Sequence, residues 1–77
     1  MDDEKLLETL GRRIRDRRGE LGWTQERLAD IAHIDRSYIG GVERGERNVT
    51  FTMLCKICVA LRCDVGTLAH QLPKVKA

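Results

Sequence analysis

The sequence has no apolar run of membrane-spanning length and no pattern typical of β-strands. A membrane helix needs about 20 consecutive apolar residues, and no run in this chain approaches that length. Apolar and polar residues nowhere alternate cleanly over a strand-length segment between turn signals. The first residues are acidic, which argues against a secretory signal peptide at that end. These absences favour a helical protein of the cytoplasm that does not contact membranes.

The chain also lacks a strong net charge. Its 77 residues include 14 Lys and Arg against 12 Asp and Glu, a net charge of +2, and this length suffices for one domain with one core. The placement of charge is more informative, because segment 11–18 holds five arginines whereas segment 2–8 holds four acidic residues. An arginine cluster on a small domain fits an anionic partner such as nucleic acid. A solvated helix face explains the same cluster equally well.

A local pattern that starts helices recurs four times, as WTQERL, IDRSYI, VTFTML and CDVGTL. Each copy places an apolar residue before a Thr or Asp and a second apolar residue five positions after the first. The Thr or Asp oxygen accepts a hydrogen bond from a free backbone N–H, and the two apolar residues pack together across the helix start. The capping residues are therefore predicted to be Thr24, Asp35, Thr50 and Asp64.

The first helix has no such start but has a clear apolar face. Leu7, Leu10, Ile14 and Leu21 fall at helical spacing, and Gly22 ends the segment. Gly45 and Pro73 are suitable stops for the third and the last helix. We predict one compact all-α domain with helices at about 4–21, 25–32, 36–44, 51–61 and 65–72, and a loose tail at 73–77.

The second and third predicted helices are joined by a turn of about three residues around His33. Two short helices joined in this way match helix-turn-helix geometry. The segment WTQERLADIAHIDRSYIGGVERGERN and the later LCKICVALRCDVGTL resemble the lambda-repressor and Cro-like (xenobiotic-response-element type) helix-turn-helix family, over roughly residues 7–72. The string DRSYIGGVERGERN more specifically resembles the small controller proteins of restriction–modification systems.

The resemblance implies that the third helix lies in the DNA major groove. It then places Arg36 and Ser37 at base edges, where Arg can bond guanine O6 and N7. Tyr38 is either a further base reader or a ring that braces the second and third helices. Gly41 stands where relatives often carry a base-reading side chain, and we interpret it as allowing close approach of the helix to the groove. A simple tolerance of small residues is the alternative at this position.

Phosphate contacts are expected at the start of the second helix and in the loop after the third. Thr24 and Gln25 stand where free N–H groups favour an anion. Arg47 and Asn48 occupy a loop that relatives often use on the DNA backbone. Either Arg12 or Arg13, of which we choose Arg13, adds attraction from the first helix.

Two groups of residues could suggest catalysis or metal binding, but a structural role is expected for both. Relatives pair the positions of Arg18 and Glu43, so these form a structural ion pair rather than a catalytic couple. Cys55 and Cys58 form a CxxC, followed by Cys63 and His70, a set that zinc would accept. Relatives carry Ala and Val at the positions of Cys58 and Cys63, so both are interpreted as small buried hydrophobes. We therefore expect no metal, no cofactor and no enzyme activity.

The predicted function is a sequence-specific transcription regulator that binds double-stranded DNA. One short recognition helix reads few bases, so a homodimer on a palindromic operator is expected, with RNA polymerase as a further partner if the protein activates. Val65, Ala69 and Leu72 are predicted to form the dimer interface, because they lie on the apolar stripe of the last helix. The alternative is an antitoxin-type or repressor-binding module that uses the same helices for a protein partner.

Overall fold

A computed structural model describes residues 1–75, which form five α-helices and no strand. The helices are α1 (Asp3–Glu20), α2 (Gln25–Ala32), α3 (Arg36–Glu43), α4 (Phe51–Ala60) and α5 (Val65–Ala69). The all-α, five-helix prediction is confirmed, and the first four helices begin and end within one residue of the predicted bounds. Residues 76–77 of the predicted tail lie outside the described residues.

Each of the four later helices begins at its predicted capping residue. The side-chain oxygens of these residues accept hydrogen bonds from backbone N–H groups of the first turn: Thr24 from Arg27 at 3.1 Å, Asp35 from Ser37 at 3.4 Å, Thr50 from Met53 at 3.2 Å and Asp64 from Thr67 at 2.9 Å. Because such a bond replaces the missing intrahelical partner, these residues fix where each helix starts.

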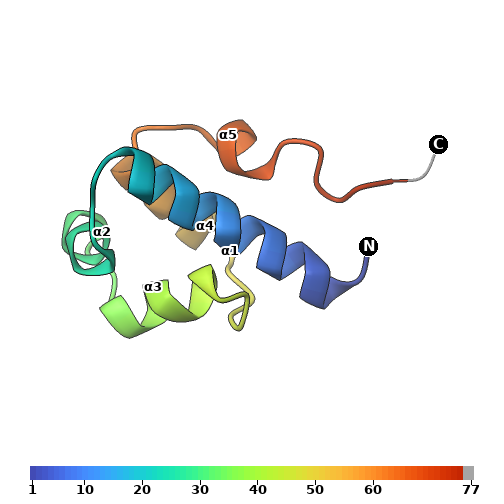
Figure 1. Ribbon diagram of the computed structural model, residues 1–77, viewed down its shortest axis with the longest axis horizontal. Helices are drawn as coiled ribbons and strands as arrows, with labels where there is room; N and C mark the ends of the chain where they lie inside the picture. Colours follow the sequence, from blue (N-terminus) through green and yellow to red (C-terminus); the bar gives the residue numbers. More distant parts are fainter. Residues whose placement is uncertain (76–77) are drawn as a thin grey trace.

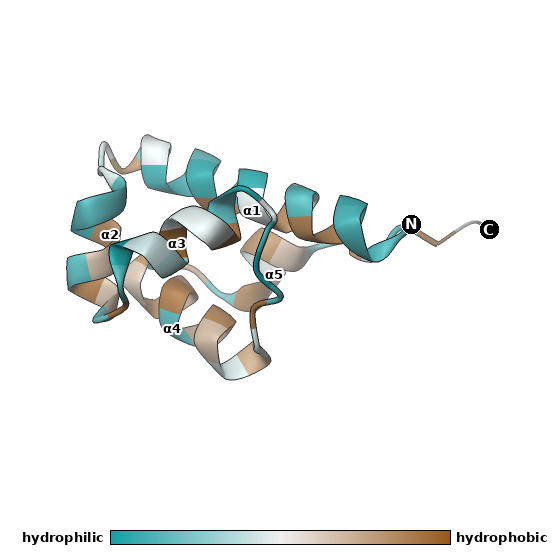
Figure 2. Ribbon diagram, turned by 90° about the horizontal axis from the view of Figure 1, so that it is seen from below, coloured by the Kyte–Doolittle hydropathy of each residue, from teal (hydrophilic) through white to brown (hydrophobic). Residues whose placement is uncertain are grey.

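The long helix α1 crosses the molecule, with α3 on one side of it and α5 on the other (Figure 1). Figure 2 shows that the outward turns of α1 are mostly hydrophilic, whereas α4 is hydrophobic along most of its length. All five helices contribute fully buried side chains to one core, the largest being Ile14, Leu28, Ile39, Ile57, Leu61 and Leu68. Helix α3, which the resemblance places in the DNA groove, therefore packs on α1 and α2 through Ile39 and Val42.

The predicted end of the last helix is wrong. Helix α5 stops at Ala69 rather than at residue 72, and Gln71 adopts a left-handed φ of 58° that a helix cannot continue through. The guanidinium of Arg13 donates from Nη1 to the carbonyls of Leu68 at 3.1 Å and His70 at 2.7 Å. A cation at this end satisfies carbonyls that have no helical partner, so a contact from α1 helps to end α5 before Pro73.

Helices α1 and α3 lie very close together at Gly11. A Cβ atom on Gly11 would lie 2.4 Å from the carbonyl oxygen of Val42 and 2.5 Å from that of Glu43. Both atoms belong to the backbone of α3, so no side-chain rotation can make room. The missing side chain of Gly11 therefore sets the separation of α1 and α3.

We expect Gly11→Ala to destabilise the protein by about 1–3 kcal/mol or more, because the methyl group forces the two helices apart. Gly19 supplies the matched control, since it lies in the same helix with no atom near its potential Cβ position. Gly19→Ala should stabilise by roughly 0.8–1 kcal/mol through helix propensity alone. Urea unfolding of the two variants measures both values. Changes of the same sign would contradict this account of α1–α3 packing.

Candidate nucleic-acid interface

Helices α2 and α3 form a helix-turn-helix whose turn is closed by His33. His33, at the predicted turn position, adopts the left-handed conformation (φ 56°, ψ 44°). The backbone N–H groups of His33 and Ile34 bond to the carbonyls of Asp30 at 3.3 Å and Ala29 at 3.0 Å. These bonds end α2 and allow the chain to turn sharply, so that Asp35 can cap α3 only two residues later.

The first residues of α3 are exposed and polar, as a DNA-reading helix start requires. The Arg36 side chain is 60% exposed, with only a long 4.0 Å approach to Glu26. The Ser37 hydroxyl donates to a carboxylate oxygen of Asp35 at 2.8 Å, and this bond lowers the pKa of Asp35 below its ordinary value. Asp35 is therefore ionised at neutral pH, and Ser37, whose hydroxyl hydrogen is used in this bond, keeps its oxygen lone pairs as acceptors. Those lone pairs fit a donor on a base edge, such as an exocyclic amino group.

Gly41 does not present open helix backbone, contrary to the interpretation of close approach. It is buried, and a Cβ there would lie 2.8 Å from Cγ of Arg47. The Arg47 side chain crosses the helix at this point, and its guanidinium carbon lies 5.3 Å from the centre of the Tyr38 ring. The glycine therefore makes room for a cation–π contact between Arg47 and Tyr38. Tyr38 is half-buried against the core, which favours its interpretation as a brace.

Three residues predicted to bind phosphate differ in whether their polar groups already have partners within the chain: Thr24, Gln25 and Asn48. Thr24 is exposed and uses its oxygen to cap α2. The side-chain amide of Gln25 donates to Glu43 at 3.1 Å, which leaves its other amide hydrogen and its backbone N–H for an anion. Asn48 is exposed in the loop between α3 and α4. Thr24 and Gln25 lie at the start of α2, and Asn48 lies beyond the end of α3.

Arg13 is not available for the phosphate contact predicted for it. Its guanidinium lies on the carbonyls at the end of α5, on the side of α1 away from α3. Arg17 acts in the same way at the end of α4, with Nε bonding the Leu61 carbonyl at 3.1 Å. Two members of the arginine cluster thus stabilise helix ends. These contacts join residues more than 40 positions apart, so local sequence patterns do not predict them.

One cation near the site was missed. Arg44 ends α3 with a 59% exposed side chain that extends over Gly40 and contacts Glu46 at 3.1 Å. The helical spacing of four residues between Gly40 and Arg44 was the signal that could have found it. Gly40 and Gly41 therefore share one role, since each lies beneath an arginine side chain that follows α3.

The predicted ion pair between Arg18 and Glu43 is present and anchors α3 to α1. Arg18 Nε and Nη2 donate to the two carboxylate oxygens of Glu43 at 2.8 and 2.9 Å. The Glu43 side chain is 2% exposed, and hydrogen bonding to it raises the pKa of Arg18. Arg18 also donates to the Trp23 carbonyl at 2.8 Å. This network ties α1, the start of α2 and the end of α3 together, and it holds the candidate DNA surface in place.

The three thiols are free and differ in burial. Cys58 is buried, and loss of solvation raises the pKa of its thiol to about 12. Cys55 and Cys63 are half-buried. Within residues 1–75, no three His, Cys, Asp or Glu side chains gather closely enough to hold a metal ion. The same residues include no helix with the length and hydropathy of a membrane span.

The residues predicted to form the dimer interface are all half-buried within one chain. Val65 and Leu72 pack against the core of their own chain, and Ala69 is the last residue of α5. Leu72 lies beyond the helix, so the three residues do not share one helical stripe as expected. The dimer interface at these residues stays a prediction, but the single helical stripe on which it was based is not present.

Comparison with known proteins places this geometry among DNA regulators. The helix-turn-helix family matches residues 14–68. The control protein C.SmaI of Serratia marcescens is 43% identical over 63 residues, which cover 82% of this chain and 75% of that protein. The restriction–modification controller protein C.AhdI of Aeromonas hydrophila superposes with a TM-score of 0.79 at 44% identity, covering 80% of this chain and 94% of that one. The controller C.Esp1396I, solved as a tetramer with its natural 35 base-pair operator, gives 0.77 at 38% identity, covering 82% and 83%.

Proposed function

This chain belongs to the helix-turn-helix family, and from that premise we propose that it is a DNA-binding transcription regulator that acts as a homodimer on a palindromic operator. The similarity to C.SmaI, C.AhdI and C.Esp1396I supports a role as controller of a restriction–modification operon in the cytoplasm of a bacterium. Regulators of this kind act by binding, so the proposal includes no catalytic step.

The observation that carries the proposal is the polar, exposed start of α3 on a buried ion-pair anchor. Arg36 and Ser37 project from the first turn of α3, while Glu43 fixes its last turn to Arg18. A recognition helix needs this combination, because side chains that read bases must be held rigidly by groups that do not touch DNA. We assign base reading to Arg36 and Ser37, and phosphate contacts to Thr24, Gln25, Arg47 and Asn48.

Selection of bound fragments from random double-stranded DNA tests the proposal. We expect a palindromic sequence whose half-sites are centred about 34 Å apart, one turn of DNA. Affinity for that sequence should fall steeply as salt rises, because bound phosphates release counterions. Recovery of no preferred sequence, together with affinity that salt does not change, would count against DNA regulation and favour a protein partner.

A further inference from the structure

The start of α3 presents two kinds of polar group to solvent. Arg36 carries only hydrogen-bond donors, and its side chain is 60% exposed. Asp35 and Ser37, one residue to either side, form a carboxylate–hydroxyl pair in which Oγ of Ser37 lies 2.8 Å from Oδ2 of Asp35. Both residues are exposed, and the backbone N–H of Ser37 also donates to Oδ1 of Asp35 at 3.4 Å. Two hydrogen bonds therefore hold these side chains together at the helix start.

The chemistry of this pair decides where the hydroxyl hydrogen lies. An ionised carboxylate only accepts hydrogen bonds, so the Ser37 hydroxyl must be the donor. With its single hydrogen used in this way, the Ser37 oxygen can only accept, as can the carboxylate oxygens of Asp35. A serine that stands alone can either donate or accept, so it distinguishes bases poorly. We refer to Asp35 and Ser37 as the acceptor pair.

The DNA major groove offers donors on only two of the four bases. Adenine presents its N6 amino group and cytosine its N4 amino group, whereas the polar groups of guanine and thymine in this groove are acceptors. The acceptor pair therefore finds a partner on adenine or cytosine and faces another acceptor on guanine or thymine. Because an acceptor that is cut off from water without a donor is costly, the pair also rejects guanine and thymine.

We propose that Asp35 is a positioning residue for base recognition, which fixes the Ser37 hydroxyl as an acceptor so that the pair selects a base with an exocyclic amino group. The base is adenine or cytosine, and it is read in each half-site in addition to the guanine contacted by Arg36. This step rests on the proposed function, because it requires that the start of α3 lies in the major groove.

The negative charge of Asp35 supports a role at bases. Asn and Ser cap helices as well as Asp does, so the fold alone does not require a carboxylate here. A carboxylate at the DNA surface repels phosphates and lowers the affinity for any sequence. At the start of α2, where phosphate contacts are expected, the cap is the uncharged Thr24. An anionic cap on α3 is therefore better explained by sequence selection than by helix capping.

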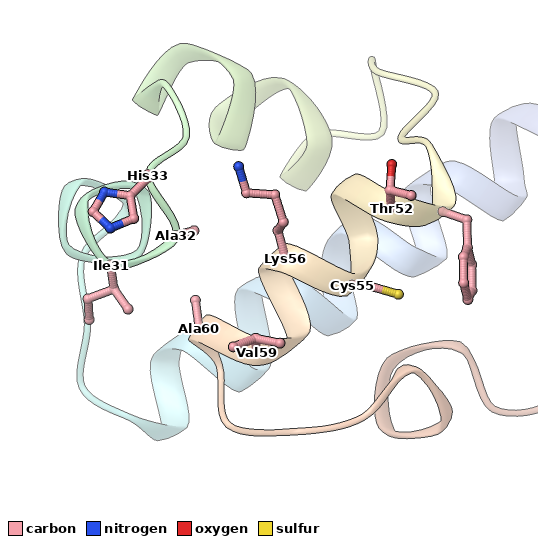
Figure 3. A pocket seen from close by; sticks show the side chains of 9 residues that line it. Ile31, Ala32, His33, Thr52, Cys55, Lys56, Val59 and Ala60 are labelled. Atoms are coloured by element: carbon pink, nitrogen blue, oxygen red, sulfur yellow. The ribbon is translucent and has the colours of Figure 1, made fainter.

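The surroundings of α3 offer no better acceptor for a base amino group. Glu26 of α2 approaches Arg36 at 4.0 Å and so faces a cation. The groove between α2 and α4 is lined mainly by apolar side chains (Figure 3), and no described residue that lines it is a carboxylate. The acceptor pair is therefore the group at the start of α3 that can meet the amino group of a base.

Asp35→Asn tests the proposal with a minimal change of shape. The amide oxygen can still cap α3, so folding should change little. The amide nitrogen now donates to the Ser37 oxygen, which frees the hydroxyl hydrogen to donate to a base. At the base position read by Ser37, we expect preference to move from adenine or cytosine toward guanine or thymine, by about tenfold in relative affinity. Titration of operators that carry each of the four bases measures this, and an unchanged preference would overturn the proposal.

Asp64 supplies the matched control, because it caps α5 with the same chemistry. Its Oδ1 accepts from the hydroxyl of Thr67 and from the Thr67 backbone N–H, both at 2.9 Å. Helix α5 lies across α1 from α3 (Figure 1), away from the candidate DNA surface. Asp64→Asn should therefore change stability by a similar amount and leave base preference unaltered. The same change of preference in both variants would mean that Asp35 acts through the fold, and the positioning role would be wrong.

Operators that lack only the amino group give a second measurement. Ser37→Ala first identifies the position where the four bases become nearly equivalent. At that position purine then replaces adenine, or 2-pyrimidinone replaces cytosine, and the analogue that applies tells the two bases apart. The unaltered protein should bind the analogue operator about tenfold more weakly, whereas Ser37→Ala, on the same duplexes, should lose little. Equal losses in the two proteins, or a preference for guanine or thymine at this position, would overturn the proposal.

The hydroxyl bond itself can be tested without DNA, by NMR titration of the Asp35 and Asp64 carboxyl carbons. A hydrogen bond to the charged form lowers the pKa of a carboxyl group, and the Ser37 and Thr67 hydroxyls are the largest causes of the lowered pKa of Asp35 and Asp64. Ser37→Ala should therefore raise the pKa of Asp35, and Thr67→Ala that of Asp64. An Asp35 pKa that Ser37→Ala leaves unchanged would show that the hydroxyl is free to donate, against the proposal.

The outcomes separate the acceptor pair from the proposed function. If selection from random DNA returns no preferred sequence, DNA regulation fails, and base recognition by the pair fails with it. If selection returns a palindrome whose base preferences respond neither to Ser37→Ala nor to Asp35→Asn, DNA regulation stands and the acceptor pair alone is overturned.

Discussion

We expect Glu43→Ala to lower the free energy of unfolding by about 3–5 kcal/mol, the largest effect of any single substitution considered. The Glu43 carboxylate is buried and accepts hydrogen bonds from Arg18 and from the amide of Gln25. The Arg18 side chain is 16% exposed, and removal of Glu43 leaves its guanidinium without a counter-charge. For a domain of this size the thermal midpoint shifts by about 4–8 °C per kcal/mol, so a fall of at least ~12 °C should be seen.

The exposed ion pair on α1, the helix that carries Arg18, supplies the control. Arg17 and Glu20 approach to 3.3 Å, with the Glu20 side chain 66% exposed. Glu20→Ala should change stability by no more than about 1 kcal/mol. Replacement of both buried partners, as Arg18→Met with Glu43→Leu, should recover most of the loss, because no charge is then left unpaired. Equal effects of Glu43→Ala and Glu20→Ala would mean that the buried pair does not anchor α3.

Features that depend on neighbouring residues were predictable from sequence. The four capping residues and the turn at His33 are predictable because a cap, its staple and the first turn of its helix all lie within six residues of chain. The end of α5 was not, because it depends on Arg13, which lies 55 residues from Leu68 in sequence. A local pattern can place Pro73 as a stop but cannot show that a distant guanidinium already satisfies the carbonyls at residue 68.

Helix α4 illustrates a different limit of sequence reasoning. Its sequence, FTMLCKICVA, is apolar nearly all round, so periodicity predicts a buried helix without showing which face meets the core. The structure divides it into a buried face with Leu54 and Ile57 and an exposed face with Phe51 and Val59. The dimer interface is predicted on α5 because Val65, Ala69 and Leu72 lie on the apolar stripe expected for that helix. For α4, the sequence pattern does not distinguish the exposed apolar residues from the buried ones.

The glycines of α3 show how one observation can have more than one cause. Two adjacent glycines in a short helix indicate that side chains are excluded there, which the resemblance attributes to the approach of DNA. In the structure, the side chains of Arg44 and Arg47 lie over Gly40 and Gly41 and fill the space that larger side chains would need. Arginine conformations depend on contacts such as the one with Tyr38, which no spacing rule specifies.

We expect Arg36→Ala to remove the preference for one guanine in each half-site of the operator. A bidentate contact from Arg to guanine contributes about 1–3 kcal/mol of discrimination, and a dimer makes this contact twice. The Arg36 side chain is mostly exposed and is held only by the long approach to Glu26, so the substitution should leave folding unchanged. Titration of the selected operator and of its single-base variants, with binding followed by fluorescence anisotropy, measures the loss at each position.

Asn48→Ala is the comparison that separates base reading from phosphate binding. Asn48 lies in the loop after α3, where a contact to the DNA backbone carries no sequence information. Its loss should weaken binding to the operator and to every single-base variant by the same factor. For Arg36→Ala, in contrast, the operator should lose affinity while variants that already lack the guanine lose almost none. If Arg36→Ala instead weakened all of these sequences equally, Arg36 would be a phosphate contact, and base reading would have to be reassigned to Ser37 and its neighbours on α3.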